Sequence, residues 1–173
     1  MAERDLEQIA KDLVDKAKAA GASAADVVAL EGEEFSTVLR LGQIEKLKEA
    51  SSKGLGLRVF IGTQSASAYS SDFSPSSLNM LVERTLEMAR ETSEDPASSL
   101  PEAGLLGSYK GDLQLHCSDV AALATEERIA WARRAEEAAM AVDPRIRNSE
   151  GAWYESNVGT KVYASSAGAS LNS

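Results

Sequence analysis

Residues 54–75 decide the fold of this chain and read GLGLRVFIGTQSASAYSSDFSP. Their first part alternates aliphatic with other residues, the period-two pattern of a strand with one buried face, at Leu55, Leu57, Val59 and Ile61. Gly62-Thr63-Gln64 reverses the chain into a second strand of small residues at 65–71, and connections this short join antiparallel strands. Ser74-Pro75 then predicts the start of a helix, because serine caps free backbone N–H groups and proline at the first helical position needs no donor.

The strand pattern extends upstream of this stretch. Residues 25–41 alternate apolar and polar side chains, which predicts one long strand, or two that are interrupted near Gly32. Leu41-Gly42-Gln43 supplies a tight reversal. Residues 43–53 are ambiguous, because Ile44 and Leu47 among Glu and Lys fit a short helix, whereas the flanking strands favour a hairpin partner.

Three segments show the apolar spacing of amphipathic helices. The first covers residues 5–20, the second runs from Pro75 to about Thr92, and the third runs from Thr125 to about Val142. Asp143-Pro144 stops the third helix, because the residue before a proline disfavours the helical conformation. Between the second and third helices, residues 93–111 have the composition of a surface connection, with Pro96, Pro101, Gly104, Gly107 and Gly111.

The last third of the chain predicts a second α+β segment. We expect a short strand at 113–118, and a hairpin of strands 146–156 and 160–167 turned at Asn157-Val158-Gly159. Residues 164–173 contain no closing helix, so this hairpin has too few neighbours to bury both faces, and we expect the segment to be truncated. The predicted fold class is α+β: an antiparallel β-meander packed with helices, followed by a second helix plus β-hairpin segment. The predicted domains are 1–94, a linker at 95–112, and an incomplete segment at 113–173.

Composition narrows the classes of function. The chain has 173 residues, of which 43% are apolar, and this suits a globular protein of one domain or two small ones. Eighteen Lys and Arg against 27 Asp and Glu give a net charge of −9, the wrong sign for binding a nucleic-acid backbone or an anionic membrane. The chain has a single cysteine and no leader with a basic part followed by an apolar part. Its apolar runs are far shorter than the ~20 residues that span a bilayer. These features predict a cytoplasmic location.

The sequence contains no recognisable catalytic set. His116 is the only histidine, so the chain has no His-Glu-x-x-His zinc helix. His116 and Cys117 are neighbours whose side chains diverge on a strand or a helix, which argues against a thiolate–imidazole pair. No serine has the glycines of a Gly-x-Ser-x-Gly elbow, and Gly54-Leu55-Gly56 lacks the third glycine of a dinucleotide loop. We therefore assign no catalytic residue and no metal ligand, and substrate-binding residues stay unknown.

Charged candidates on the predicted strands have structural interpretations. Arg58 is expected to pair across to Asp or Glu in place of gripping a ligand carboxylate. Glu31, Glu33 and Glu34 lack the spacing of a calcium loop, so we interpret them as a solvated edge and not as a divalent-cation site.

The remaining candidates lie in the second half of the chain. Trp131 and Trp153 are too few and too far apart for a base-stacking platform, and we interpret them as core or domain-contact residues. Arg145 follows Asp143-Pro144 in a natural helix-to-strand turn, and Asn148 is expected to hydrogen-bond to local backbone.

Three stretches occur together in an order that is specific to one family. They read LGQIE at 41–45, GLGLRV at 54–59 with ASAYSSDFSP at 66–75, and DPRIRNSEGA at 143–152. Over nearly the whole chain they resemble the N-terminal region of the TldD/PmbA family, and the PmbA branch more than the TldD branch. These proteins are known as modulators of DNA gyrase and as zinc metallopeptidases that act as paired subunits.

This resemblance has several implications. It implies that residues 43–50 form a strand, and that the parent protein continues well beyond Ser173. In the family, the zinc-binding His-Glu-x-x-x-His lies in the C-terminal portion and is missing from the PmbA-like partner subunit. No catalytic or zinc-binding role is therefore carried over to this chain, and zinc is expected only in a catalytic partner or in the missing C-terminal part.

The function implied by the resemblance is that of a PmbA/TldE-like subunit in a cytoplasmic metallopeptidase complex. This portion would act as a scaffold that helps to enclose unfolded peptides, with a TldD-like partner subunit or a second copy completing the oligomer. Two alternatives stay open: a non-enzymatic protein-binding or regulatory module of the gyrase-modulator type, and a truncated catalytic TldD-type zinc peptidase.

Overall fold

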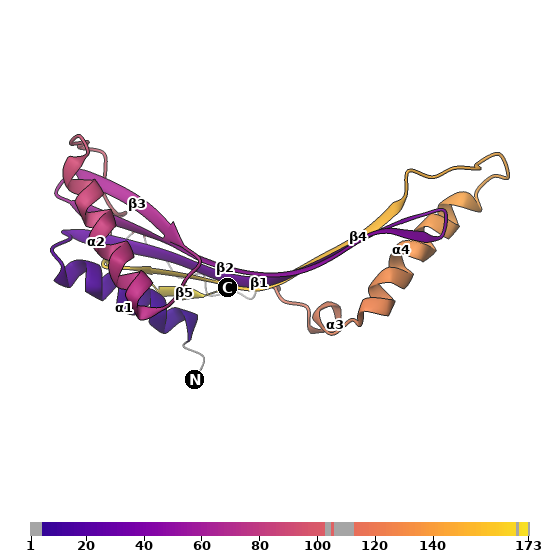
Figure 1. The fold of residues 1–173 in the computed structure, drawn as a ribbon, viewed down its shortest axis with the longest axis horizontal. Coiled ribbons are helices and arrows are strands. Elements are labelled where there is room, and N and C mark those ends of the chain that lie inside the picture. Colours follow the sequence, from indigo (N-terminus) through magenta and orange to yellow (C-terminus); the bar gives the residue numbers. More distant parts are fainter. Residues whose placement is uncertain (1–4, 103–104, 106–112, 169, 173) are drawn as a thin grey trace. The chain divides into compact units, whose positions relative to one another are not determined.

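A computed structural model describes residues 5–102, 105, 113–168 and 170–172. Its elements are, in chain order, α1 (Leu6–Ala19), β1 (Ala24–Arg40), β2 (Gln43–Ile61), β3 (Gln64–Ser70), α2 (Pro75–Glu91), α3 (Ser118–Ala121), α4 (Thr125–Met140), β4 (Ala152–Ser165) and β5 (Ser170–Asn172). The five strands form a sheet of order β3-β2-β1-β4-β5 (Figure 1). The predicted α+β class and the β-meander are confirmed, because β1, β2 and β3 are successive neighbours. None of the helices described is long and apolar enough to cross a membrane.

The chain forms two compact units, and each unit is discontinuous in sequence. Unit 1 comprises Met1–Glu31, Lys53–Asp112 and Thr160–Ser173, and unit 2 comprises Gly32–Ser52 and Leu113–Gly159. The contacts therefore group 32–52 with the downstream segment, whereas the sequence suggested a linear division at 95–112. That division into folding domains stays a prediction. Gly104, Gly107 and Gly111 of the expected linker lie outside the described residues.

The core of unit 1 lies between one face of the sheet and the helices α1 and α2, which pack beside each other (Figure 1). α1 begins after Asp5, whose side chain accepts a hydrogen bond from the Glu7 N–H at 3.1 Å. α2 begins with Pro75 after Ser74, and the Ser74 hydroxyl accepts from the Ser77 N–H at 3.4 Å. Both helix starts agree with the sequence prediction. The sheet contributes alternate residues to this core, including Val27, Leu57 and Val162, each with no exposed surface.

The β2–β3 hairpin is confirmed in detail. Its antiparallel register runs from Leu55 opposite Ser70 to Ile61 opposite Gln64, and Gly62 at the turn has a φ of 61°. β2 continues upstream as one strand to Gln43, which confirms the strand implied by the family resemblance for 43–50. β1 is also uninterrupted at Gly32, so the alternative of two shorter strands is wrong.

Two expectations for the last third are wrong. The predicted hairpin at 157–159 does not form, because β4 runs continuously from Ala152 to Ser165. Gly159 lacks the positive φ of a tight hairpin turn, and its Cα lies 3.2 Å from where a Cβ on Gly32 would stand, so it serves a close strand approach. The predicted strand at 113–118 is also wrong, because its first five residues have no regular structure and Ser118 begins α3.

The third predicted helix is confirmed as α4 of unit 2. It begins at Thr125, and the Glu127 carboxylate accepts a hydrogen bond from the Ala124 N–H at 3.1 Å. A glutamate at this position is half of a capping box, and Ala124 has no side-chain oxygen to supply the other half. Few α4 residues are buried, namely Ala132 and Glu136.

Candidate functional site

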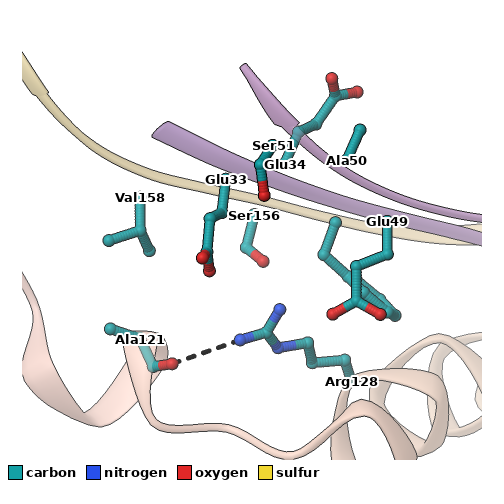
Figure 2. A pocket seen from close by; sticks show the side chains of 10 residues that line it. Glu33, Glu34, Glu49, Ala50, Ser51, Ala121, Arg128, Ser156 and Val158 are labelled. Carbon is teal, nitrogen blue, oxygen red and sulfur yellow. Dashed lines mark hydrogen bonds between the residues drawn. The ribbon is translucent and has the colours of Figure 1, made fainter. Parts of the chain in front are cut away.

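A pocket of about 230 Å³ lies within unit 2 between its strands and its helices (Figure 2). Residues 33–35 of β1 and 49–51 of β2 line one side, together with Ser156 and Val158 of β4. Ala121 of α3 and Arg128 of α4 line the other side. The lining carries three glutamates and one arginine, so the pocket is acidic overall.

Arg128 is held in this pocket by two contacts of different kinds. Its Nη2 donates a hydrogen bond to the Ala121 carbonyl oxygen at 3.2 Å, as drawn in Figure 2. Its guanidinium carbon lies 5.0 Å from the centroid of the buried Phe35 ring, a cation–π distance. Phe35 in turn meets Tyr154 edge-on, with ring centroids 6.1 Å apart. The Arg128 Nε is buried, and no described residue accepts a hydrogen bond from it.

The carboxylates around the pocket do not neutralise Arg128. Figure 2 shows Glu33 and Glu49 pointing from the strands toward the guanidinium, yet no ion pair joins either of them to it within the described structure. Glu34 is paired instead with Lys48, whose Nζ donates to its Oε2 at 2.7 Å. The neighbours Glu33 and Glu34 therefore have different surroundings, and their interpretation as a solvated edge stays a prediction.

A second polar cluster of unit 2 fixes the β1–β2 turn to α4. Glu136 is only 5% exposed, and its two oxygens accept hydrogen bonds from the backbone N–H groups of Leu41 and Gly42, both at 2.8 Å. Arg133 completes the contact by donating from Nη1 to the Gly42 carbonyl oxygen at 3.0 Å. The hydrogen bond from the Gly42 N–H is the main cause that lowers the pKa of Glu136 below its ordinary value.

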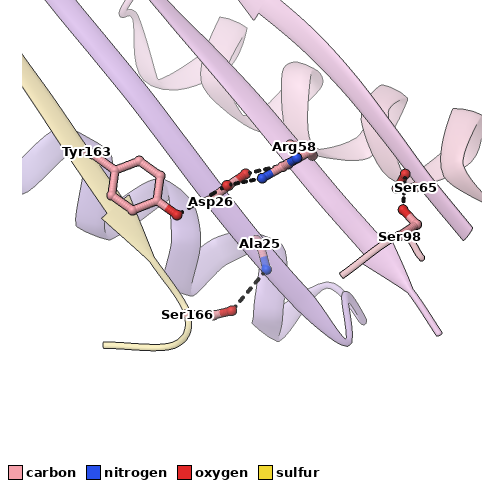
Figure 3. Close-up of polar contacts among 7 residues, drawn as sticks. All are labelled: Ala25, Asp26, Arg58, Ser65, Ser98, Tyr163 and Ser166. Atoms are coloured by element: carbon pink, nitrogen blue, oxygen red, sulfur yellow. Dashed lines mark hydrogen bonds and ion pairs between the residues drawn. The ribbon is translucent and has the colours of Figure 1, made fainter. Parts of the chain in front are cut away.

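A charged cluster lies on the sheet of unit 1 (Figure 3). Arg58 donates from Nε to Asp26 Oδ1 at 3.0 Å and from Nη2 to Oδ2, and the Tyr163 hydroxyl donates to Oδ2 at 3.3 Å. The hydrogen bond to Asp26 raises the pKa of Arg58, and burial followed by the Asp26 charge raises the pKa of Tyr163. The predicted cross-strand pairing of Arg58 is confirmed.

The other sequence candidates lie apart from these clusters. His116 and Cys117 are exposed in the segment before α3. Trp131 and Trp153 are 52% and 72% exposed, so neither is a core residue, and the alternative that they are domain-contact residues stays a prediction. Both are large, and their exposed rings instead leave apolar surface on unit 2.

The turn after α4 is built locally. Arg145 forms an ion pair with Asp143, whose carboxylate also accepts from the Arg145 backbone N–H at 2.8 Å, and this hydrogen bonding lowers the pKa of Asp143. The structural interpretation of Arg145 is therefore confirmed. Asn148 is exposed, and its side chain forms no hydrogen bond to another described residue, so the expected bond to local backbone is wrong.

Sequence reasoning missed Arg128 and Glu136. The helical pattern placed both on the third helix, but nothing in local spacing distinguishes them from the solvated charges beside them. The one usable signal for Glu136 was the predicted turn at Leu41-Gly42, because the free N–H groups of a tight turn need acceptors.

The family resemblance makes zinc the metal to test, and the described residues do not fit it. No group of three or more His, Cys, Asp or Glu side chains in them is placed to hold a metal ion. Structural and catalytic zinc sites both need at least three such protein ligands.

Two models of protein-family domains match this chain. Residues 25–89 match the PmbA/TldA metallopeptidase domain 1, and residues 118–173 match the PmbA/TldA metallopeptidase central domain. The chain belongs to the TldD/PmbA family and matches its N-terminal region.

Two curated relatives support this membership. The chain is 35% identical over 96% of its length to the metalloprotease PmbA homolog of Haemophilus influenzae, and 36% identical over 78% of its length to metalloprotease PmbA of Escherichia coli O157:H7. It spans 36% and 29% of the lengths of these two proteins.

Three solved structures share the fold. A modulator of DNA gyrase from Bacteroides thetaiotaomicron superposes on 100% of this chain with a TM-score of 0.87 and 24% identity, over 39% of its own length. A second such modulator, from Thermotoga maritima, has a TM-score of 0.81 at 20% identity. The match covers 98% of this chain and 37% of the Thermotoga chain. TldE from Thermococcus kodakarensis has a TM-score of 0.81 at 14% identity. The match covers 95% of this chain and 36% of the TldE chain.

Proposed function

We propose that this chain is the N-terminal portion of a PmbA/TldE-like subunit in a cytoplasmic TldD/PmbA-type metallopeptidase complex. In that complex it acts as a scaffold that helps to enclose unfolded peptides during proteolysis. The observation that carries this proposal is the 35% identity to the Haemophilus influenzae PmbA homolog over 96% of the chain. Zinc is then held outside the described residues, in a TldD-like partner or in the rest of the parent protein.

The strand β2 supplies a means of holding an extended peptide. β3 pairs with β2 only from Leu55 onward, so the segment 43–53 has β1 on one side and no described strand on the other. All but Ala50 of these residues are exposed. An open strand edge of this kind presents main-chain N–H and C=O groups to which an extended peptide adds as a further strand, with little selectivity for its side chains.

Two proline substitutions test strand addition. Successive residues of an edge strand direct their N–H groups alternately to the open side and to the neighbouring strand. Of Lys46→Pro and Leu47→Pro, one therefore removes an outward N–H group and the other an N–H group that bonds to β1. We expect the substitution at the outward N–H to leave the subunit folded and to slow cleavage of an unfolded protein such as reduced, alkylated casein. The assay uses the full-length subunit together with its TldD-like partner, and circular dichroism identifies which variant keeps the native fold.

The matched control is Glu155→Gln, an exposed substitution on β4 that leaves every backbone donor in place. Cleavage at the control's rate by the folded proline variant would remove strand addition as the mechanism. A full-length subunit that binds no TldD-like partner and supports no cleavage would remove the proposed function itself.

A protein-binding or regulatory module is the second candidate function, and the large apolar side chains exposed on unit 2 favour it. Leu41, Val142 and Trp153 are 53%, 78% and 72% exposed. Contact with another protein would remove these side chains from water. Stable binding of a non-peptidase protein, with no effect on cleavage by a TldD-like subunit, would favour this candidate. A His-Glu-x-x-x-His motif in the parent protein would instead make the parent a catalytic TldD-type subunit.

A further inference from the structure

The open edge of β2 in unit 2 carries an ordered pattern of charge. Residues 45–49 read Glu-Lys-Leu-Lys-Glu, all of them are exposed, and no described strand lies beside them on the side away from β1. Main-chain pairing at such an edge has little selectivity by itself. The side chains that flank the edge add selectivity, because directly opposite side chains of neighbouring antiparallel strands interact.

The two signs of charge lie on opposite faces of this strand. Successive side chains of a strand point to opposite faces, which groups Lys46 with Lys48 and Glu45 with Glu49. The contacts agree with this grouping. Lys48 Nζ donates to Glu34 Oε2 at 2.7 Å, and Figure 2 shows Glu34 pointing away from the pocket toward which Glu49 points. One face of the edge is therefore basic and the other is acidic.

Part of this charge has no partner in the chain. Lys46 and Glu49 form no ion pair within the described structure. Glu45 Oε1 lies 3.9 Å from Arg40 Nη1, and both side chains are exposed. The side chain of Lys48 is 47% exposed although it is paired. A neighbouring strand with opposite charges at these positions would therefore gain attraction that the chain itself does not supply.

The same pattern disfavours a second copy of this chain as the neighbour. If two copies paired antiparallel with Leu47 opposite Leu47, each Glu45 would face a Glu49 and each Lys46 would face a Lys48. Like charges directly opposite each other destabilise a pair of strands. The occupant that this edge fits is therefore a strand with the reverse order of charge.

We propose that the edge of β2 at 45–49 selects extended peptide segments whose charges complement its own. Such a segment places acidic residues opposite the two lysines and basic residues opposite the two glutamates. It reads basic-acidic-apolar-acidic-basic, with the apolar residue opposite Leu47, which is 51% exposed. This inference rests on the proposed function, because it names the class of unfolded segment that strand addition at this edge takes.

Segments of other composition fit the edge less well. A uniformly basic segment would meet like charge at Lys46 and Lys48, and a uniformly acidic one would meet it at Glu45 and Glu49. An apolar segment would gain the main-chain hydrogen bonds, but it would draw the charged side chains partly out of water without pairing them.

Two peptides of identical composition and net charge test the proposal. The matching probe contains Lys-Glu-Val-Glu-Lys and the reversed probe contains Glu-Lys-Val-Lys-Glu, each with blocked ends, the same glycine-serine flanks and the same dye. Fluorescence anisotropy measures the binding of each probe to the full-length subunit without its TldD-like partner. We expect the matching probe to bind about tenfold more tightly, because it meets opposite charges where the reversed probe meets like charges. Raising the salt concentration to about 1 M should reduce this ratio, because salt screens exposed charges.

A charge exchange on the strand supplies the decisive variant. In Lys46→Glu/Glu49→Lys, each probe meets two opposite and two like charges, so the preference should disappear while both probes still bind. Both side chains are exposed and outside the ion pairs of the described residues, so the variant keeps the fold. The matched control is Arg84→Glu/Glu87→Lys, which exchanges an exposed ion pair on α2 and should leave the preference unchanged.

Three results would overturn the proposal. Equal binding of the two probes by the unaltered subunit would overturn it and leave strand addition in place. Absence of binding of both probes at millimolar concentration would overturn it together with strand addition. Self-association of the subunit that changes in Lys46→Glu/Glu49→Lys would assign the edge to a second copy. The proposed function is decided separately by cleavage of casein with the TldD-like partner, and its failure would leave the measured preference of the subunit standing.

Discussion

At the scale of single residues, Glu136 shows how a buried carboxylate stabilises a turn. Leu41 and Gly42 both have positive φ, 49° and 74°, and their N–H groups point to the two oxygens of Glu136. An L-residue such as Leu41 pays about 1–2 kcal/mol for this conformation, so the turn needs compensating contacts. Glu136 and Arg133 supply them from α4.

The lowered pKa of Glu136 predicts a pH-dependent contribution to stability. Because the folded-state pKa is below the unfolded value, the contribution is fully present above the unfolded value of about 4.3 and is lost as the pH falls through the folded value. Glu136→Gln should therefore lower the free energy of unfolding at pH 7. It should have a smaller effect at about pH 3, which lies below the ordinary pKa of a glutamate. Urea unfolding followed by tryptophan fluorescence measures this, because both tryptophans belong to unit 2.

The neighbouring Glu137 is exposed, and Glu137→Gln serves as the control for this measurement. It is expected to change the unfolding free energy by less than about 0.5 kcal/mol at either pH. An equal loss for Glu136→Gln at both pH values would contradict the assignment of the lowered pKa to the turn contact.

Asp26 has the corresponding role in unit 1. Asp26 is 6% exposed, and its carboxylate accepts hydrogen bonds from Arg58 and Tyr163. Asp26→Asn replaces one acceptor oxygen with a donor that faces other donors, and we expect a loss of about 1–3 kcal/mol in the free energy of unfolding. Far-UV circular dichroism in urea measures it, with the exposed Asp15→Asn as control. A loss no larger than the control's would show that the cluster is solvated and does not contribute to stability.

At the scale of elements, Gly32 determines how closely β1 and β4 approach. A Cβ at Gly32 would stand 2.9 Å from the Val158 carbonyl oxygen, a backbone atom that cannot move aside cheaply. Gly32→Ala should therefore destabilise the chain by about 1–3 kcal/mol. Gly56 is also a strand glycine but has no atom within 4 Å of its would-be Cβ, and Gly56→Ala should be neutral or stabilise by about 0.4–1 kcal/mol.

Thermal unfolding of this pair of variants distinguishes a close strand approach from a general effect of glycine. Similar midpoints for Gly32→Ala and Gly56→Ala would contradict a close approach of β4 to Gly32. The same comparison tests the description of β4 as one continuous strand, because the close approach exists only if β4 passes Gly32 without turning.

These elements also show what a sequence reveals and what it does not. The helices α1, α2 and α4 and the β2–β3 hairpin were predictable, because apolar periodicity and caps are local signals. The course of β4 was not, because Asn157-Val158-Gly159 has turn composition and only the opposite glycine of β1 explains Gly159. Residues 43–53 required the family resemblance, because an exposed edge strand lacks the buried face that gives a strand its pattern.

The candidate site was less predictable than the fold. The pairing of Arg58 with Asp26 followed from its place on a strand. The pocket around Arg128 did not, because it collects residues from three strands and two helices that are distant in sequence. Only tertiary structure distinguishes Glu33 and Glu49, which border that pocket unpaired, from Glu34, which pairs with Lys48.

At the scale of the whole molecule, the two units differ in how much apolar surface they bury. The main core cluster lies entirely in unit 1, where α1, α2 and the sheet contribute to it. In unit 2 the buried apolar side chains of the described residues are Phe35, Leu39 and Ala132, while Trp131 is 52% exposed. Because burial of apolar area is the dominant stabilising contribution, unit 2 should open at a lower free energy than unit 1.

Non-coincident unfolding curves would reveal this difference. We expect the urea midpoint from tryptophan fluorescence, which reports unit 2, to lie below the midpoint from far-UV circular dichroism, to which α1 and α2 of unit 1 contribute. Leu57→Ala removes a fully buried side chain of the unit 1 core and should cost about 2–5 kcal/mol, seen mainly in the dichroism transition. Coincident transitions that shift together in this variant would mean that the strands β1, β2 and β4 couple the units into one cooperative structure. In that case the small core of unit 2 would be stabilised by the continuity of its strands and not by its own burial.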